Sequence, residues 1–241
     1  MTESSSTAPA SGVSHIDALP PGTRLAEFEI LGLLGVGGGL IIVPAMVWVL
    51  EAAGVTHQVQ HLALGTSLAV MVFTSFASVR AHHARGAVDW SIVKRMAPAM
   101  IVGMLVGSQI AGWIPSHDLK WFFVVYAYVI ALQMLADKKP QGGRPLPGPL
   151  GLWSSGGVIG VISSFVGIGG GSMSVPFMSW CNVPMPRAIA TSAALGWPIA
   201  VAGAVGYVIS GWHAPDLPPG AVGFVYLPGL FTLSVVTVLV A

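Results

Sequence analysis

Two glycine clusters are the residues of this sequence best suited to chemistry, because consecutive peptide N–H groups can converge on an anion. The clusters are Gly37, Gly38 and Gly39, and Gly169, Gly170 and Gly171. Glycine adopts left-handed angles without a Cβ clash, and such a run before a helix can form an anion-binding nest. The alternative is close helix packing through small residues. Because both clusters are followed by Val-Pro, we favour a binding site for a small anion.

Hydroxyl side chains follow or accompany each cluster and could donate to an anion without carrying charge. They are Thr66 and Ser67 in the first half, and Ser172, Thr191 and Ser192 in the second. A Ser or Thr inside a helix often bonds its own i−4 carbonyl instead. With the glycines, these residues form the predicted substrate-binding set.

Charged side chains are missing from the centre of the second to seventh apolar segments, so neutral donors would have to hold the anion. The single cysteine, Cys181, and the histidine spacing match no zinc or haem site, and we expect no metal and no cofactor. His61 stands at the start of the second segment, where it could titrate or attract an anion. A structural role for His61 is the alternative.

A second function from another class is an intramembrane serine hydrolase, because a serine after glycines can lie near an oxyanion hole. Ser172 or Ser174 would be its nucleophile. No histidine lies inside a span to act as its base, and the first cluster has Leu40 where the second has Ser172. We therefore favour a protein that is not an enzyme.

Composition defines the elements that must position these residues. Of 241 residues, 54% are hydrophobic and 8% charged, against roughly 25% charged in a soluble domain. The formal net charge of +1 excludes the basic surface of a nucleic-acid-binding protein. The chain is therefore expected to be an all-α, polytopic membrane protein with the lipid bilayer as its environment.

Seven apolar segments are long enough to be candidate spans. They are roughly 25–50, 62–80, 91–113, 119–136, 149–182, 188–211 and 219–241. The first and fifth contain the glycine clusters, which predicts broken or re-entrant helices. Residues 1–22, rich in Ser, Ala and Pro, are expected to be a disordered tail.

An internal duplication relates the two halves. The stretch from Gly35 to Met46 recurs from Gly167 to Met178 with seven of twelve positions identical, and the Thr-Ser pair recurs in the same order. We therefore predict two membrane repeats, residues 23–140 and 141–241. The second repeat has no counterpart of segment 119–136, so its last helix is expected to be missing.

The distribution of Lys and Arg predicts the orientation, provided that each glycine-containing segment crosses the membrane once. One side receives Arg24, Arg80, Arg85, Lys94, Arg95, Lys138, Lys139 and Arg144, and the other receives Lys120 and Arg187. The first side, with the N-terminus, is expected to be cytoplasmic.

These motifs together resemble the TauE/SafE sulfite exporter family, also called the TSUP anion permeases. The resemblance rests on the paired glycine clusters, the Thr66-Ser67 motif and the run from Arg80 to Trp90, and it covers about residues 25–241. It implies an inner-membrane protein of about eight spans in two repeats that moves sulfite, sulfoacetate or other small organic anions.

The function predicted from residues and resemblance is a secondary transporter or permease of a small anion, namely sulfite, an organosulfonate or a related carboxylate. The absent last helix leaves one alternative open, a non-transporting fragment or scaffold derived from such a permease. Whether the chain forms a homo-oligomer is also left open.

Overall fold

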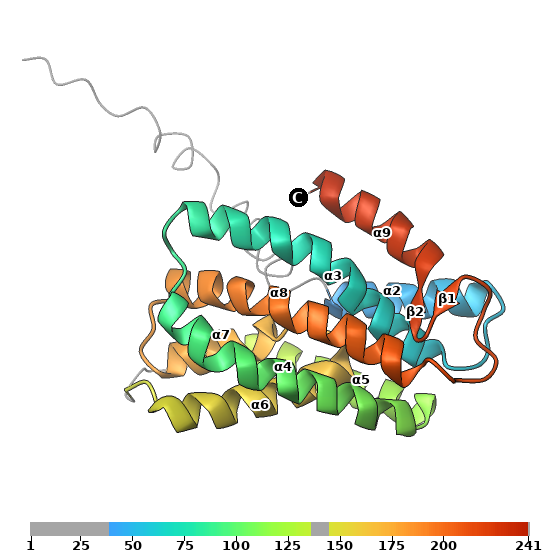
Figure 1. Ribbon diagram of the computed structural model, residues 1–241, viewed down its shortest axis with the longest axis horizontal. Helices are drawn as coiled ribbons and strands as arrows, with labels where there is room; N and C mark the ends of the chain where they lie inside the picture. The colour runs from blue at the N-terminus through green and yellow to red at the C-terminus, as the bar shows by residue number, and fades with distance from the viewer. Residues whose placement is uncertain (1–38, 136–144, 241) are drawn as a thin grey trace, which may run out of the picture. The chain divides into compact units, whose positions relative to one another are not determined.

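The computed structural model describes residues 39–135 and 145–240, which belong to one compact unit, Gly35–Ala241 (Figure 1). These residues form eight helices and one short hairpin. The helices are α2 (Gly39–Ala52), α3 (Val59–Ala84), α4 (Trp90–Trp113), α5 (Ser116–Leu135), α6 (Pro149–Val166), α7 (Gly171–Trp180), α8 (Met185–Ser210) and α9 (Leu227–Val240), and the hairpin strands are β1 (Ala221–Val222) and β2 (Val225–Tyr226). The predicted all-α class is confirmed.

The helices follow the predicted segments, with one difference. Segment 149–182 is broken as predicted, into α6 and α7. Segment 219–241 is wrong as a single helix, because the antiparallel β1–β2 hairpin precedes α9. Residues 25–38 and the predicted tail 1–22 lie outside the described part of the chain.

Four helices are long and apolar enough to cross a membrane, namely α3, α4, α6 and α8. Helix α7 has 10 residues, and α2 has 14 within the described residues. At 1.5 Å per residue, helices of these lengths extend only part of the way through a hydrocarbon core of roughly 30 Å. The chain is therefore a multi-pass membrane protein that combines full-length and half-length helices.

Small residues set the packing of the long helices. The α4–α6 contact is tight because Gly103 of α4 and Gly160 of α6 place no Cβ between the backbones. A Cβ at Gly156 would meet Met96 and Met100 on α4, and a Cβ at Gly160 would meet Met100 and Met104, so the two helices run in parallel. Helix α3 packs against α8 in the opposite direction, since Gly65 lies beside Tyr207 and Leu68 beside Gly203.

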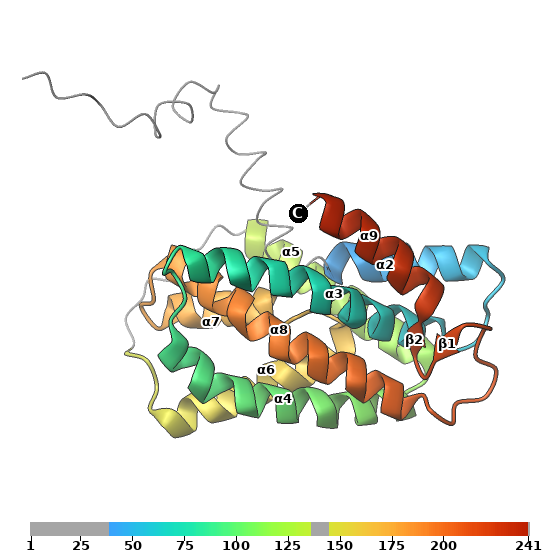
Figure 2. The ribbon, with the colours of Figure 1, turned by 45° about the horizontal axis from the view of Figure 1, so that its top comes forward.

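These directions give the unit two ends, which Figures 1 and 2 show at opposite sides of the long helices. The Asp89 end comprises residues 85–90, 145–149 and 181–187. The His61 end comprises residues 53–61, 113–116 and 211–226, where the His61 ring stacks on Phe224 with centroids 4.8 Å apart.

The half-helices α2 and α7 start close together and run toward opposite ends. Gly39, the first residue of α2, lies against Ile168, and Gly170, just before α7, lies against Met100 and Ile199 near the midpoints of α4 and α8. Helix α2 leads to the His61 end, where Glu51 lies 3.3 Å from Lys120. Helix α7 leads to the Asp89 end and connects there to α8 (Figure 2).

This geometry corrects the predicted side of Arg187. Helix α6 starts at the Asp89 end and α7 finishes at that same end. Segment 149–182 therefore does not cross the membrane as one span. Arg187 lies at the Asp89 end, close enough for its charge to act on Asp89. Among the described residues, that end also holds Arg85, Lys94 and Arg95, whereas Lys120 lies at the His61 end. The N-terminus is outside the described part.

Candidate functional site

Gly39 of the first glycine cluster contacts Gly167 and Ile168, the two residues before Gly169, near the middle of the unit. A Cβ at Gly39 would lie 2.6 Å from the Gly167 carbonyl oxygen and 2.8 Å from Ile168 Cγ1. The missing side chain therefore allows α2 to begin against the turn that precedes α7. Gly37 and Gly38, the other predicted members of the first cluster, lie outside the described residues.

The turn between α6 and α7 is built on two glycines with left-handed angles. Gly167 has φ of 69° and ends α6 by donating its N–H to Ser163 O at 2.9 Å, and Gly170 has φ of 73°. The N–H of Gly170 donates to Ile168 O at 2.8 Å. The predicted nest of three free N–H groups is therefore wrong for this cluster, because the turn itself uses the middle donor.

Two peptide donors stay available at the start of α7. Within the described residues, no backbone acceptor bonds the N–H of Gly171 or of Ser172, which belong to the first turn of the helix. The first N–H groups of a helix carry the positive end of its dipole. An anion here would meet two donors and a helix N-terminus, and no charged side chain is buried around them in the part of the chain that the structure describes.

The four helix hydroxyls of the predicted set are buried and bonded within the protein. Thr66 Oγ1 accepts from the Tyr226 N–H at 2.9 Å, and Thr191 Oγ1 accepts from the Asp89 N–H at 3.0 Å. Ser67 Oγ donates to Gly167 O at 3.1 Å, and Ser192 Oγ lies 2.9 Å from Ser174 Oγ. Ser67 thus contacts the glycine turn and Ser192 contacts α7, whereas the threonines contact the residues that precede α4 and α9.

Ser174 makes the intrahelical bond that a Ser or Thr inside a helix often makes. Its Oγ donates to the i−4 carbonyl of Gly170 at 2.7 Å. Ser172 instead bonds the Tyr126 hydroxyl at 2.5 Å. Within the described residues neither serine bonds a histidine, so these contacts supply no base for the hydrolase alternative.

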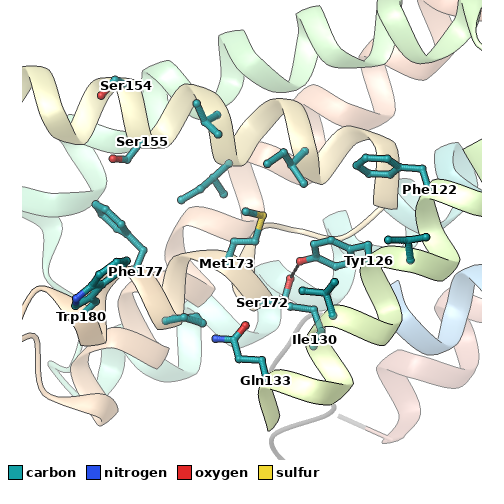
Figure 3. A pocket seen from close by; sticks show the side chains of 16 residues that line it. Phe122, Tyr126, Ile130, Gln133, Ser154, Ser155, Ser172, Met173, Phe177 and Trp180 are labelled. Carbon is teal, nitrogen blue, oxygen red and sulfur yellow. Dashed lines mark hydrogen bonds between the residues drawn. The ribbon is translucent and has the colours of Figure 1, made fainter. Parts of the chain in front are cut away.

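A pocket of about 800 Å³ opens between α5, α6 and α7 (Figure 3). Its lining is mainly aliphatic and aromatic, and Ser172 is the member of the predicted site that lines it. Figure 3 shows Tyr126 and Ser172 pointing toward one another at one side and Trp180, Ser154 and Ser155 at the other. The pocket therefore leads from the first turn of α7 toward the Asp89 end.

Sequence reasoning missed the contribution of α5 to this pocket. Tyr126 and Gln133 line it from α5, which carries no glycine motif. The available signal was the presence of these two polar side chains within an apolar segment.

His61 has a structural role, the alternative to attracting an anion that the sequence left open. Only 1% of its surface is exposed, and it is the one buried side chain of the His, Lys, Arg, Asp and Glu types among the described residues. Its Nε2 donates to Ala111 O at 2.9 Å, because a carbonyl only accepts, and its Nδ1 is 2.8 Å from Ser116 Oγ. The ring thereby ties α3 to the α4–α5 connection.

Neither a metal cluster nor an extended charged site is found in the part that the structure describes. Residues 39–135 and 145–240 contain no group of three or more His, Cys, Asp or Glu side chains that could hold an ion. The chemistry available at the glycine turn is therefore that of neutral N–H and O–H donors.

Comparison with known proteins gives consistent matches. The model of the family described as Sulfite exporter TauE/SafE matches residues 28–241. A probable membrane transporter protein of Haemophilus influenzae is 33% identical over 212 residues, covering 87% of this chain and 80% of its own length. The probable membrane transporter protein YunE of Bacillus subtilis is 28% identical, with 78% of each chain covered. No solved structure matches the chain.

Proposed function

The chain belongs to the TauE/SafE sulfite exporter family of membrane transporters, and from this premise we propose that it carries a small anion across the membrane. The proposed substrates are sulfite, an organosulfonate or a related carboxylate. The proposed location is the inner membrane, with the arginine-rich Asp89 end on the cytoplasmic side.

One observation carries the proposal, namely that two half-helices begin side by side in the middle of the unit. The start of α2 at Gly39 contacts the turn from which α7 begins. Half-helix N-termini that meet at the midplane are the feature by which broken-helix transporters bind anionic groups. Two converging dipoles favour an anion even where no cationic side chain is present.

The proposed site consists of the donors next to this junction. The Gly171 and Ser172 N–H groups would bind the anion, and the Ser172 hydroxyl would turn from Tyr126 to donate as well. The pocket lined by Ser172 and Tyr126 supports an access route from the Asp89 end. Neutral donors give moderate affinity, which suits a carrier that must release its substrate.

Transport follows from exposing this junction to each side in turn. Two related halves that rock against each other would change which end reaches the site. The full-length helices α3, α4, α6 and α8 supply the surfaces for that motion. The most extensive helix contacts among the described residues are those of α4 with α6, of α3 with α8, and of α4 with α8.

Anion flux into proteoliposomes tests the proposal. With purified chain incorporated, sulfite or sulfoacetate should enter faster than chloride and far faster than in empty vesicles. Ser172→Leu should reduce the flux at least tenfold, because its side chain would occupy the junction. Thr232→Leu, a similar change at an exposed position of α9, should leave the flux unchanged.

The outcome also decides the remaining alternative. Well-incorporated, monodisperse protein that moves none of these anions would contradict the proposal and favour the non-transporting scaffold. Equal flux in the Ser172→Leu and unsubstituted proteins would leave transport standing and remove the site.

A further inference from the structure

Two hydrogen bonds connect the predicted halves in the same way at opposite ends. Thr191 of α8 accepts the N–H of Asp89, the residue before α4, at 3.0 Å. Thr66 of α3 accepts the N–H of Tyr226, the residue before α9, at 2.9 Å. Each threonine comes from one half, and each donor precedes a proline-containing helix of the other half.

The two threonines occupy equivalent places in the sequence, whereas the donors do not, since Asp89 lies nine residues before Pro98 and Tyr226 lies two residues before Pro228. Thr66 and Thr191 are the threonines of the duplicated Thr-Ser pair, and both are completely buried. The helices that they position, α4 and α9, carry Pro98 and Pro228. We name the first contact the Asp89 latch and the second the Tyr226 latch.

Each latch fixes where a helix of the opposite half begins. At the Asp89 latch the aspartate side chain also caps α4, accepting from the Ser91 N–H at 3.0 Å. At the Tyr226 latch the donor is the last residue of β2, so the bond orients the hairpin as well as α9. Breaking either bond leaves a backbone N–H without its buried partner.

We propose that the latches are positioning contacts that hold the two ends of the transporter closed, and that each opens while the other stays formed. This rests on the proposed alternating exposure of the site. A single neutral hydrogen bond suits this role, because its net contribution is small enough to be exchanged in each cycle. The threonines thereby act on transport by holding helices, whichever anion is carried.

The chain contains its own reporter for the Asp89 end. Cys181 is the single cysteine, is 8% exposed, and lies in the connection between α7 and α8. Opening of that end should raise the rate at which N-ethylmaleimide modifies the thiol. The measurement needs no substrate, so it is independent of the anion assignment.

The test compares matched valine substitutions at the two latches. Thr191→Val, which is isosteric but cannot accept the Asp89 N–H, should raise the modification rate of Cys181 at least about fivefold, as expected for losing one net hydrogen bond. Thr66→Val removes the same bond at the other end and should leave the rate unchanged or lower it. Thr191→Ser should restore the slow rate, because it keeps the acceptor.

Equal acceleration by Thr191→Val and Thr66→Val would overturn the proposal, because it would indicate general loosening. No acceleration by either variant would overturn it as well. If Thr191→Val does not fold, Thr191→Ala against Thr191→Ser provides the same comparison. Faster Cys181 labelling in Thr191→Val alone, without anion flux in the unsubstituted protein, would support the latches and reject the transport proposal. Anion flux together with equal labelling of the two variants would support transport and reject the latches.

Discussion

The half-buried Asp89 makes hydrogen bonds through both its side chain and its backbone N–H at the start of α4. Its side chain accepts from both the N–H and the hydroxyl of Ser91, at 3.0 and 2.7 Å, and its own N–H donates to Thr191. The Ser91 hydroxyl, with further help from the Ser91 N–H and the charge of Arg187, lowers the pKa of Asp89 against the opposing effect of burial. The carboxylate thus stabilises the start of α4 at the end where that helix meets α8.

Replacing this cap should destabilise the protein in a way that depends on pH. Asp89→Ala should lower the free energy of unfolding by about 1 kcal/mol, typical of a lost N-cap, whereas Asp89→Asn keeps an acceptor and should cost much less. Because the folded pKa is depressed, the stability from ionised Asp89 is fully present above the ordinary pKa of about 3.9 and is lost as pH falls through the folded pKa.

Thermal unfolding of the three proteins in detergent, measured from pH 7 to pH 3, checks this prediction. The difference between the unsubstituted protein and Asp89→Asn should shrink at the acid end. A difference that grows on acidification would contradict the assigned role of the charge.

At the scale of elements, the seam between α4 and α6 depends on particular glycines. A Cβ at Gly160 would clash with the Met100 carbonyl and lie 3.0 Å from the Met104 N, whereas a Cβ at Gly157, one turn earlier, has the Ala99 oxygen at 3.9 Å. Helix α6 therefore has no room for a side chain at Gly160 but has room for a methyl group at Gly157.

Gly160→Ala should consequently be more damaging than Gly157→Ala. We expect Gly160→Ala to cost about 1 to 3 kcal/mol, as overpacking does, and Gly157→Ala to be neutral or slightly stabilising, since alanine favours a helix over glycine. Thermal midpoints of the two variants measure the contrast. Equal midpoints would show that α4 and α6 separate easily, against the packing described.

Much of this element structure could be predicted from the sequence, because lipid requires long apolar helices and glycine clusters break them. The return of α7 to the Asp89 end could not, since a run such as 149–182 has the same composition whether it crosses or turns back. The side of Arg187 was wrong for this reason. The pocket-lining face of α5 was missed because its polar residues form no motif.

The candidate site shows the same division. The sequence predicted that the glycine turns and the paired hydroxyls form one site. In the structure Gly39 and Ser67 both lie at the Gly167 oxygen, and Ser192 bonds Ser174 of α7. The sequence did not reveal which partner each hydroxyl bonds, because these bonds join residues up to 160 positions apart. The role of the threonines at helix starts emerges only from those long-range contacts.

At the scale of the whole molecule, helices that face in opposite directions are arranged about one uncharged junction. Helices α3 and α8 run in opposite directions, as do α2 and α7. The helices α2 and α7 lead from the junction to opposite ends, and the pocket beside α7 leads toward the Asp89 end, which fits one state of a carrier that opens to each side in turn. The central claim is that this junction binds an anion.

Thermal unfolding of the detergent-purified protein with sulfite, sulfoacetate, sulfate and chloride tests that claim most directly. Ligand at about 100 times its dissociation constant should add roughly 2.7 kcal/mol of stability. The account predicts a raised midpoint with sulfite or sulfoacetate, little change with chloride, and loss of the effect in Ser172→Leu but not in Thr232→Leu. The same midpoint in all four anions, or an equal shift in Ser172→Leu, would contradict an anion site at the junction of α2 and α7.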